Sequence, residues 1–287
     1  MGFRFRPKKT GQDKTCVRLR HDPSGIEDSP LSARLGSILP AMGLVILSTV
    51  SLVRAQESGW SVEVGADRAA VSVEGRDSFW GTDYFRLSHL SAAQGASLTV
   101  ELQRRDGNVD AVLLAGGHRH FGRSWTLSAQ AGLAPRADFY FRHMAEVELA
   151  RHWGRVVTHL SYRNLGFKTG TVHVVSPAAT VRFSRAEIQA RAFLARSADF
   201  APKSAAFLFR GDWDASGRIR LSGGAAVGEG IFDVTSLAGA SPPGWVAFLA
   251  SQFRLSPRNL LGIVVTLAHE DPAFERRSAG FYYRRLL

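Results

Sequence analysis

The sequence contains a single cysteine, Cys16, near its start. The rest of the chain can therefore form no disulfide and offers no thiolate nucleophile or cysteine-ligated metal site. Lysine is also scarce beyond residue 55, where only Lys168 and Lys203 occur. A nucleic-acid-binding domain usually gathers lysine and arginine on one face, whereas the arginines here are spread along the chain. The composition therefore argues against nucleic acid as a partner.

Beyond Ala55 the chain has no apolar run long enough for a membrane helix, but one such run lies before it. Residues 35–53 carry no charge, follow a basic segment and end at Val53-Arg54-Ala55. This order is typical of a secretory signal peptide, with cleavage before Gln56; a retained membrane anchor is the alternative. We expect residues 1–55 to form a basic leader and signal peptide, and 56–287 to form one domain. Part of the net charge of +11 belongs to the leader.

Apolar and polar residues alternate through most of the remaining sequence, as in strands with two different faces. In residues 97–103, Leu98, Val100 and Leu102 share one face. Residues 138–150 continue the pattern, with Phe139 and Phe141 on the apolar face. Counting such segments back from the C-terminus predicts an all-β fold of about 14 strands, with 12 as the alternative. The uncertain region is 60–74, where the apolar parity changes and a β-bulge is expected.

The expected connections alternate between tight turns and mostly longer loops. The tight turns lie near 91–96, 118–124, 152–155, 183–186, 214–217 and 256–259, and the other connections at 134–138, 166–171, 196–204, 229–244 and 270–276. Short turns on one rim and longer loops on the other are typical of a transmembrane, antiparallel, up-and-down β-barrel. The sequence therefore predicts such a barrel in the outer membrane of a Gram-negative cell, with lipid and lipopolysaccharide around it.

Aromatic residues near the expected strand ends favour a membrane barrel over a soluble periplasmic β-sandwich. Trp125, Trp153, Trp213 and Trp245 all lie close to expected turns, and rings at strand ends suit the headgroup region. The last residues, 281–287, alternate and end on an apolar residue. They resemble the C-terminal signal that the barrel-assembly machinery reads, which makes this machinery an expected partner.

Residues 138–229 resemble the YaiO family of outer-membrane β-barrels. The resemblance rests on Asp138-Phe139-Tyr140, on Leu160-Ser161-Tyr162-Arg163, on 172–177 with 181–183, on Gln189–Phe193, and on Gly223-Gly224 with Gly228-Glu229. Residues 178–179 are Ala-Ala where the family would have Gly-Leu. The resemblance implies an outer-membrane barrel with a link to surface or exported polysaccharide. It carries over no catalytic residue.

No motif in the sequence predicts a catalytic residue, a metal site or a cofactor, so we expect the protein not to be an enzyme. His118 and His120 share one strand face but lack an acidic third ligand nearby in sequence. His159 with Ser161 supplies the residue types of an outer-membrane lipid hydrolase without a recognisable motif. A hydrolase is therefore the second alternative function.

Charged residues on the polar strand faces are the best candidates for a functional lining. The candidates are Arg142, Arg163, Arg182, Arg191, Arg210, Arg220, Glu146 and Glu148. Arg155 and Arg254 fall on the same parity, and Glu101 and Asp212 are expected as further acidic partners. The set has two interpretations: a rigid scaffold filled by arginine–carboxylate pairs, or a narrow, net positive lumen that favours anions or acidic oligosaccharides.

Overall fold

The computed structural model describes residues 58–73, 75–197, 203–229, 243–270 and 274–287. The expected leader and the cleavage site before Gln56 lie outside the described residues. No helix in the described part of the chain is long and apolar enough to cross a membrane.

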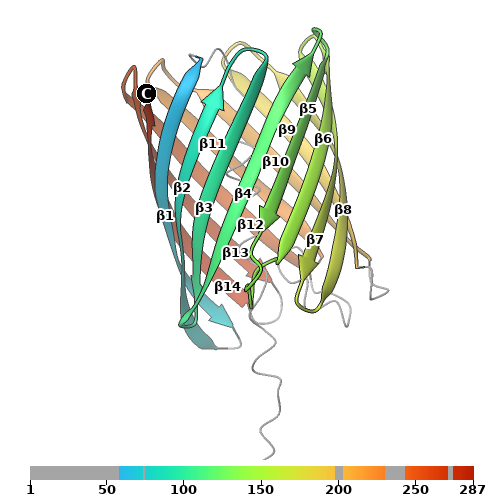
Figure 1. Ribbon diagram of the computed structural model, residues 1–287, viewed down its shortest axis with the longest axis vertical. Coiled ribbons are helices and arrows are strands. Elements are labelled where there is room, and N and C mark those ends of the chain that lie inside the picture. Colours follow the sequence, from blue (N-terminus) through green and yellow to red (C-terminus); the bar gives the residue numbers. More distant parts are fainter. Residues whose placement is uncertain (1–57, 74, 198–202, 230–242, 271–273) are drawn as a thin grey trace, which may run out of the picture.

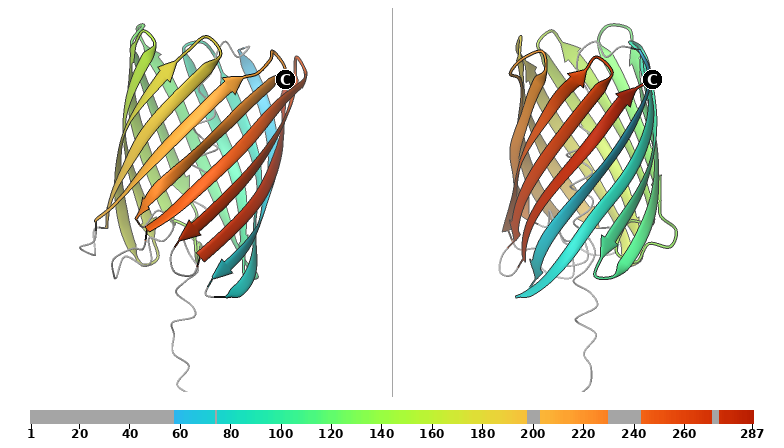
Figure 2. Two further views of the ribbon diagram at one scale, coloured as in Figure 1. Left: turned by 180° about the vertical axis from the view of Figure 1, so that it is seen from behind. Right: turned by 90° about the vertical axis from the view of Figure 1, so that its left-hand side faces the viewer.

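The described chain forms one closed antiparallel barrel of 14 strands (Figures 1 and 2). The strands are β1 (Gly59–Val73), β2 (Arg76–Leu90), β3 (Gln94–Arg105), β4 (Asn108–Phe121), β5 (Trp125–Leu133), β6 (His143–Trp153), β7 (Val156–Phe167), β8 (Gly170–Arg182), β9 (Ala186–Ser197), β10 (Lys203–Asp214), β11 (Ile219–Glu229), β12 (Pro243–Ser256), β13 (Asn259–Glu270) and β14 (Phe274–Leu286). Each strand pairs with its neighbours in sequence, and β1 pairs with β14 to close the wall. The predicted fold and strand number are confirmed.

The outer wall exposes large apolar side chains along its whole circumference. Leu160 on β7 is 56% exposed and Leu249 on β12 is 62% exposed. In each strand, the residues that alternate with these outward side chains face inwards. In the half of the barrel that holds the start of β1 and the end of β14, the inward residues are mostly polar. An apolar outside around a polar inside is stable only where lipid covers the outer wall. The alternation in the sequence therefore reflects a wall between lipid and a lumen.

The two rims differ in their connections, as expected. One rim, at the top of Figure 1, holds the start of β1, the end of β14 and only short connections; we call it the tight-turn rim. The opposite rim is called the loop rim. Three of its connections are also tight: 74–75, 106–107 and 168–169. The expectation of a longer loop at 166–171 was wrong, because β7 and β8 pair as far as Phe167 and Gly170.

Exposed aromatic rings mark the tight-turn rim as a membrane interface. They belong to Trp60, Phe121, Trp125, Trp153, Phe183 and Trp213. Rings of this kind suit the headgroup level of a bilayer. Arg151 on β6 stacks on Trp153 at 3.6 Å from the ring centre, which holds a cation at the same level.

The bulge expected in 60–74 is absent, because β1 pairs with both β14 and β2 in an unbroken register. The apolar residues change sides for another reason. Val64 faces lipid, whereas Ala69 and Val71 face the interior, where they join an apolar cluster with Leu208 and Phe248 near the loop rim. The lumen itself becomes apolar at this end, so the parity of apolar residues changes without any change in the strand.

Candidate functional site

The inner wall carries most of the charged residues that the sequence singled out. Arg163, Arg182, Arg191, Arg210, Arg220, Glu146 and Glu148 all lie on inward positions of their strands, where burial alternates with exposed neighbours. Arg155 is exposed in a tight turn, and Arg254 is exposed near the end of β12. Arg142 lies just before β6 and is not on a strand. Its expected position on a strand face was therefore wrong.

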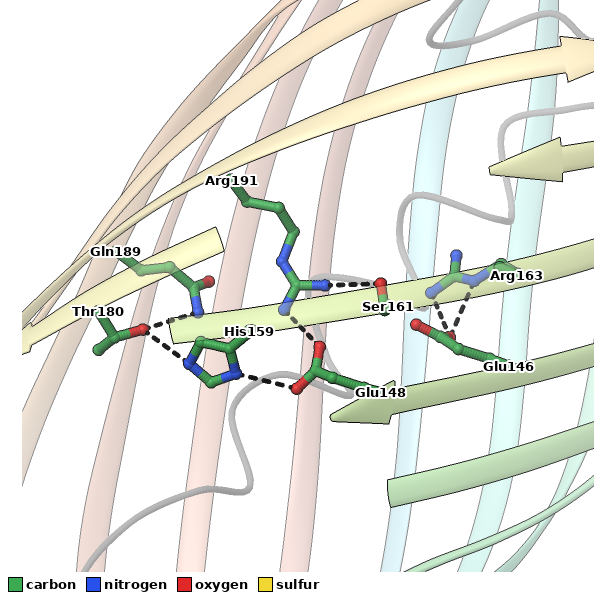
Figure 3. A network of polar contacts seen from close by, with 8 residues as sticks. All are labelled: Glu146, Glu148, His159, Ser161, Arg163, Thr180, Gln189 and Arg191. Atoms are coloured by element: carbon green, nitrogen blue, oxygen red, sulfur yellow. Dashed lines mark hydrogen bonds and ion pairs between the residues drawn. The ribbon is translucent and has the colours of Figure 1, made fainter. Parts of the chain in front are cut away.

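Polar contacts join β6, β7, β8 and β9 across the inner wall, as one Arg163–Glu146 pair and a separate chain through Glu148 (Figure 3). Arg163 donates to Glu146 through Nε at 2.8 Å and Nη2 at 2.6 Å. Arg191 donates through Nη2 to Glu148 at 2.7 Å and through Nη1 to Ser161 at 3.4 Å. These are charge-assisted bonds, the stronger class of hydrogen bond in proteins. They fix two guanidinium groups against the wall.

The same chain continues through a histidine. His159 Nδ1 lies 3.1 Å from the second oxygen of Glu148, and His159 Nε2 lies 3.2 Å from the Thr180 hydroxyl. Gln189 donates to that hydroxyl at 3.1 Å. The contacts are mutually consistent if Nδ1 of a neutral His159 donates to Glu148 and Thr180 donates to Nε2. Glu148 is thus shared by Arg191 and His159.

A small residue allows Arg191 to span two strands. Arg191 on β9 lies across from Ala178 on β8, which lies across from His159 on β7. The guanidinium crosses over the Ala178 methyl group to reach Ser161 on β7 and Glu148 on β6. A leucine at position 178, or any side chain of that size, would occupy this path.

Other inward arginines are paired with carboxylates as well. Arg284 and Arg86 contact Glu63 at 2.5 and 3.4 Å, Arg210 and Arg220 contact Asp212 at 2.8 and 3.5 Å, Arg276 contacts Asp67 at 3.1 Å, and Arg182 contacts Glu187 at 3.2 Å. Asp212 therefore has the expected kind of partner. Glu101 instead accepts a hydrogen bond from Gln103 at 3.0 Å.

The net positive wall expected from the sequence is not present in the described strands. Glu63, Asp67, Asp110, Glu187 and Glu270 also face inwards, so the inward carboxylates are at least as numerous as the inward strand arginines. The expectation failed because it considered too few of the acidic residues. The resulting wall carries charges of both signs in close pairs.

A cavity of about 210 Å³ lies against this wall, in the half of the lumen towards the tight-turn rim. Its lining combines the paired charges of Arg191 and Glu148 with the hydroxyls of Ser61, Ser97 and Ser128. Such a lining presents both hydrogen-bond donors and acceptors. It suits a polar solute that itself carries both.

The connection between β5 and β6 folds into the lumen at the loop rim. We call residues 134–142 the inward segment. Its aromatic residues Phe139, Tyr140 and Phe141 are buried and pack against inward side chains of the wall, including Val112 and Leu165. The expected strand 138–150 therefore begins only at His143, and Phe139 and Phe141 do not face lipid. Instead they narrow the lumen.

One carboxylate anchors the inward segment. Asp110, on the inner face of β4, accepts backbone N–H groups of Asp138 at 3.2 Å, Phe139 at 3.1 Å and Tyr140 at 3.0 Å. The two ends of the segment are held by backbone bonds from Ala134 N–H to the Arg142 carbonyl and from Arg142 N–H to the Gly166 carbonyl. The segment is thus a defined structural element whose conformation depends on Asp110.

The histidines considered above as metal ligands or catalytic residues contact other side chains of the wall. Thr126 bridges His120 and His152 through contacts of 2.7 and 3.0 Å. Ser161 is bonded to Arg191, while His159 contacts Glu148 and Thr180. Within the described residues, no group of three or more His, Cys, Asp or Glu side chains could hold a metal ion.

Sequence reasoning missed two residues that shape the site, Asp110 and Ala178. Asp110 could have been suspected, because it is an isolated acid on the inward parity of 108–121. The role of Ala178 could not be recognised in the sequence, because it depends on which residues lie across from it in β7 and β9.

Comparisons with known proteins support the fold. No family model and no curated protein matches the chain. Among solved structures, a "Bacterial polysaccharide outer membrane secretin" aligns with a TM-score of 0.55 and 8% identity, over 81% of this chain and 100% of the other. The "CymD monoaromatic hydrocarbon channel" aligns with a TM-score of 0.53 and 7% identity, over 81% and 89%. The chain has the fold of outer-membrane barrels, and its apolar outer wall belongs in that membrane.

Proposed function

We propose that the protein is an outer-membrane channel for small, hydroxyl-rich solutes such as saccharides. The observation that carries this proposal is the cavity wall, on which paired arginines and carboxylates alternate with serine and threonine hydroxyls. A saccharide offers donors and acceptors in equal measure and can exchange its water for these groups. The inward segment narrows this path near the loop rim.

The pairing of charges determines the expected selectivity. A guanidinium bonded to a carboxylate still has N–H groups to offer, but the field of the pair largely cancels at a distance. A balanced wall should therefore pass neutral and anionic solutes at comparable rates. This proposal replaces the anion selectivity expected from the arginines alone; a narrow, arginine-lined porin for anions or acidic oligosaccharides remains the alternative.

The fold and the sequence give the proposal two further supports. A polysaccharide secretin and a hydrocarbon channel share the barrel at very low identity, so they support the architecture and leave the solute open. The order of residues in 138–229 supports a YaiO-type barrel linked to surface or exported polysaccharide. The proposal includes no catalytic step.

Swelling of liposomes that contain the purified barrel tests this function. We expect influx of a neutral disaccharide, and of a uronic-acid disaccharide of similar size, at rates within about threefold of each other. Protein-free liposomes and liposomes with the heat-unfolded protein are the controls. Absence of influx for all solutes would contradict the channel, and a strong preference for the acidic sugar would favour the anion-selective alternative.

A further inference from the structure

The outer wall carries an unusual charged patch near the loop rim. Arg68 on β1, Asp83 on β2, Arg104 on β3 and Arg277 on β14 all point away from the lumen. We call these four residues the outer-wall arginine patch. They occupy adjacent strands, which Figure 2 (right) shows side by side. Elsewhere along the middle of the described strands the outward positions are mainly apolar, so the patch is a local feature.

The register brings the patch residues together. Arg68 and Arg104 both lie across from Gly81 on β2, one on each side. Because Gly81 has no side chain, Arg68 can lie over it, and a Cβ at that position would come within 3.2 Å of Arg68 Cδ. Arg277 lies across from Ala70, the next outward position after Arg68 towards the loop rim. Arg68, Arg104 and Arg277 thus occupy neighbouring outward positions on β1, β3 and β14.

Asp83 holds two of these arginines but does not neutralise the patch. Arg68 donates to Asp83 at 2.6 Å and also to the carbonyls of Asp67 and Thr82. Arg104 contacts the other oxygen of Asp83. Asp83 is the one hydrogen-bonding partner of Arg104 among the described residues, which leaves most of its five N–H groups available. Arg277 is 77% exposed and pairs with Glu275 at 3.6 Å, so three guanidinium groups face two carboxylates in this part of the wall.

The patch lies near the boundary between hydrocarbon and headgroups. Arg68 lies eight residues along β1 from Trp60, which belongs to the aromatic ring of the tight-turn rim. A strand rise of about 3.3 Å per residue and a tilt of about 40° place Arg68 about 20 Å above that ring. The apolar band of an outer-membrane barrel is about 25 Å tall. Arg68 therefore lies about 5 Å inside the far boundary of this band, a distance that a long arginine side chain can span to reach a lipid phosphate in the outer leaflet.

We propose that the outer-wall arginine patch binds the phosphate groups of a phosphorylated glycolipid of the lipid A type. Arginine offers paired N–H groups that match phosphate oxygens. The exposed Leu102 lies one outward position from Arg104 towards the tight-turn rim, where an acyl chain would contact it, whereas Phe79 lies on the loop-rim side of Gly81 and Val109 lies across from Arg104. This inference is independent of the channel function, because the patch lies on the opposite side of the wall from the lumen.

Native mass spectrometry of the detergent-purified full chain tests this site, with lipid A as the probe. We expect Arg68→Gln together with Arg104→Gln to reduce retained bisphosphorylated lipid A at least tenfold. Arg119→Gln is the matched control, since Arg119 also faces outwards but lies on the tight-turn rim, and it should retain lipid as the wild type does. Heat-modifiable gel mobility verifies that each variant is folded.

Two further probes identify the chemistry. Lipid A that lacks one phosphate should bind more weakly than the bisphosphorylated form, and phosphatidylglycerol should bind weakly to both wild type and variant. Unchanged retention in the double variant would overturn the proposal. Equal retention of lipid A and phosphatidylglycerol by the wild type would also overturn it, because the site would then recognise no glycolipid phosphate.

Discussion

Replacing Asp110 with alanine should raise the single-channel conductance of the reconstituted barrel several-fold. Its carboxylate accepts the N–H groups of Asp138, Phe139 and Tyr140, which hold the inward segment against the wall. A buried N–H group that loses its partner costs about 1–3 kcal/mol. Loss of three such bonds should release the inward segment from the position in which it narrows the lumen. Recordings in planar bilayers, at one salt concentration, measure the change.

The matched control for this variant is Asp138→Asn. Asp138 belongs to the same inward segment, but its side chain is 67% exposed and pairs with the exposed Lys168 at 3.1 Å. Its replacement leaves the three N–H bonds to Asp110 intact and should leave the conductance unchanged. Equal conductance for wild type and Asp110→Ala would show that the inward segment does not limit the path.

Replacing Glu148 with alanine should lower the free energy of unfolding by about 3–5 kcal/mol, the usual cost of leaving one member of a buried ion pair without its partner. Glu148 serves both Arg191, whose side chain is 4% exposed, and His159. Urea-induced unfolding of the barrel in lipid vesicles measures this loss. The double variant Glu148→Leu with Arg191→Met removes both charges and should recover a substantial part of the stability.

An exposed ion pair provides the comparison for this experiment. Asp138→Ala removes the contact with Lys168, whose side chain is 59% exposed, and should change the free energy of unfolding by about 0–1 kcal/mol. If Glu148→Ala and Asp138→Ala have similarly small effects, the polar chain across β6 to β9 does not stabilise the wall. If the double variant is less stable than Glu148→Ala alone, the unpaired Arg191 is not the source of the loss.

The fold could be predicted from the sequence because lipid imposes one rule on the whole outer wall. Residues such as Leu98 and Leu160 face lipid and alternate with polar residues that face the lumen. The prediction failed where the interior also becomes apolar. Val71 and Phe139 are apolar residues that face inwards, so parity alone assigned a bulge to one region and an extended strand to the other.

The candidate site was predictable only in part, because alternation identifies a face and not a register. It assigns Arg191 and Glu148 to the lumen, yet these residues are 43 positions apart and three strands apart around the wall. Their contact depends on the exact offset of β6 to β9 and on the small side chain of Ala178. The conformation of the inward segment could not be predicted either, because it depends on Asp110, which lies on a different strand, β4.

The most direct test of the proposed channel is a planar-bilayer recording of the wild-type barrel under a gradient of potassium chloride. An open lumen with paired charges predicts a small, measurable conductance and a reversal potential close to zero, because neither ion is strongly favoured. Absence of conductance would contradict the open lumen. A reversal potential close to the chloride equilibrium potential would contradict the balanced wall.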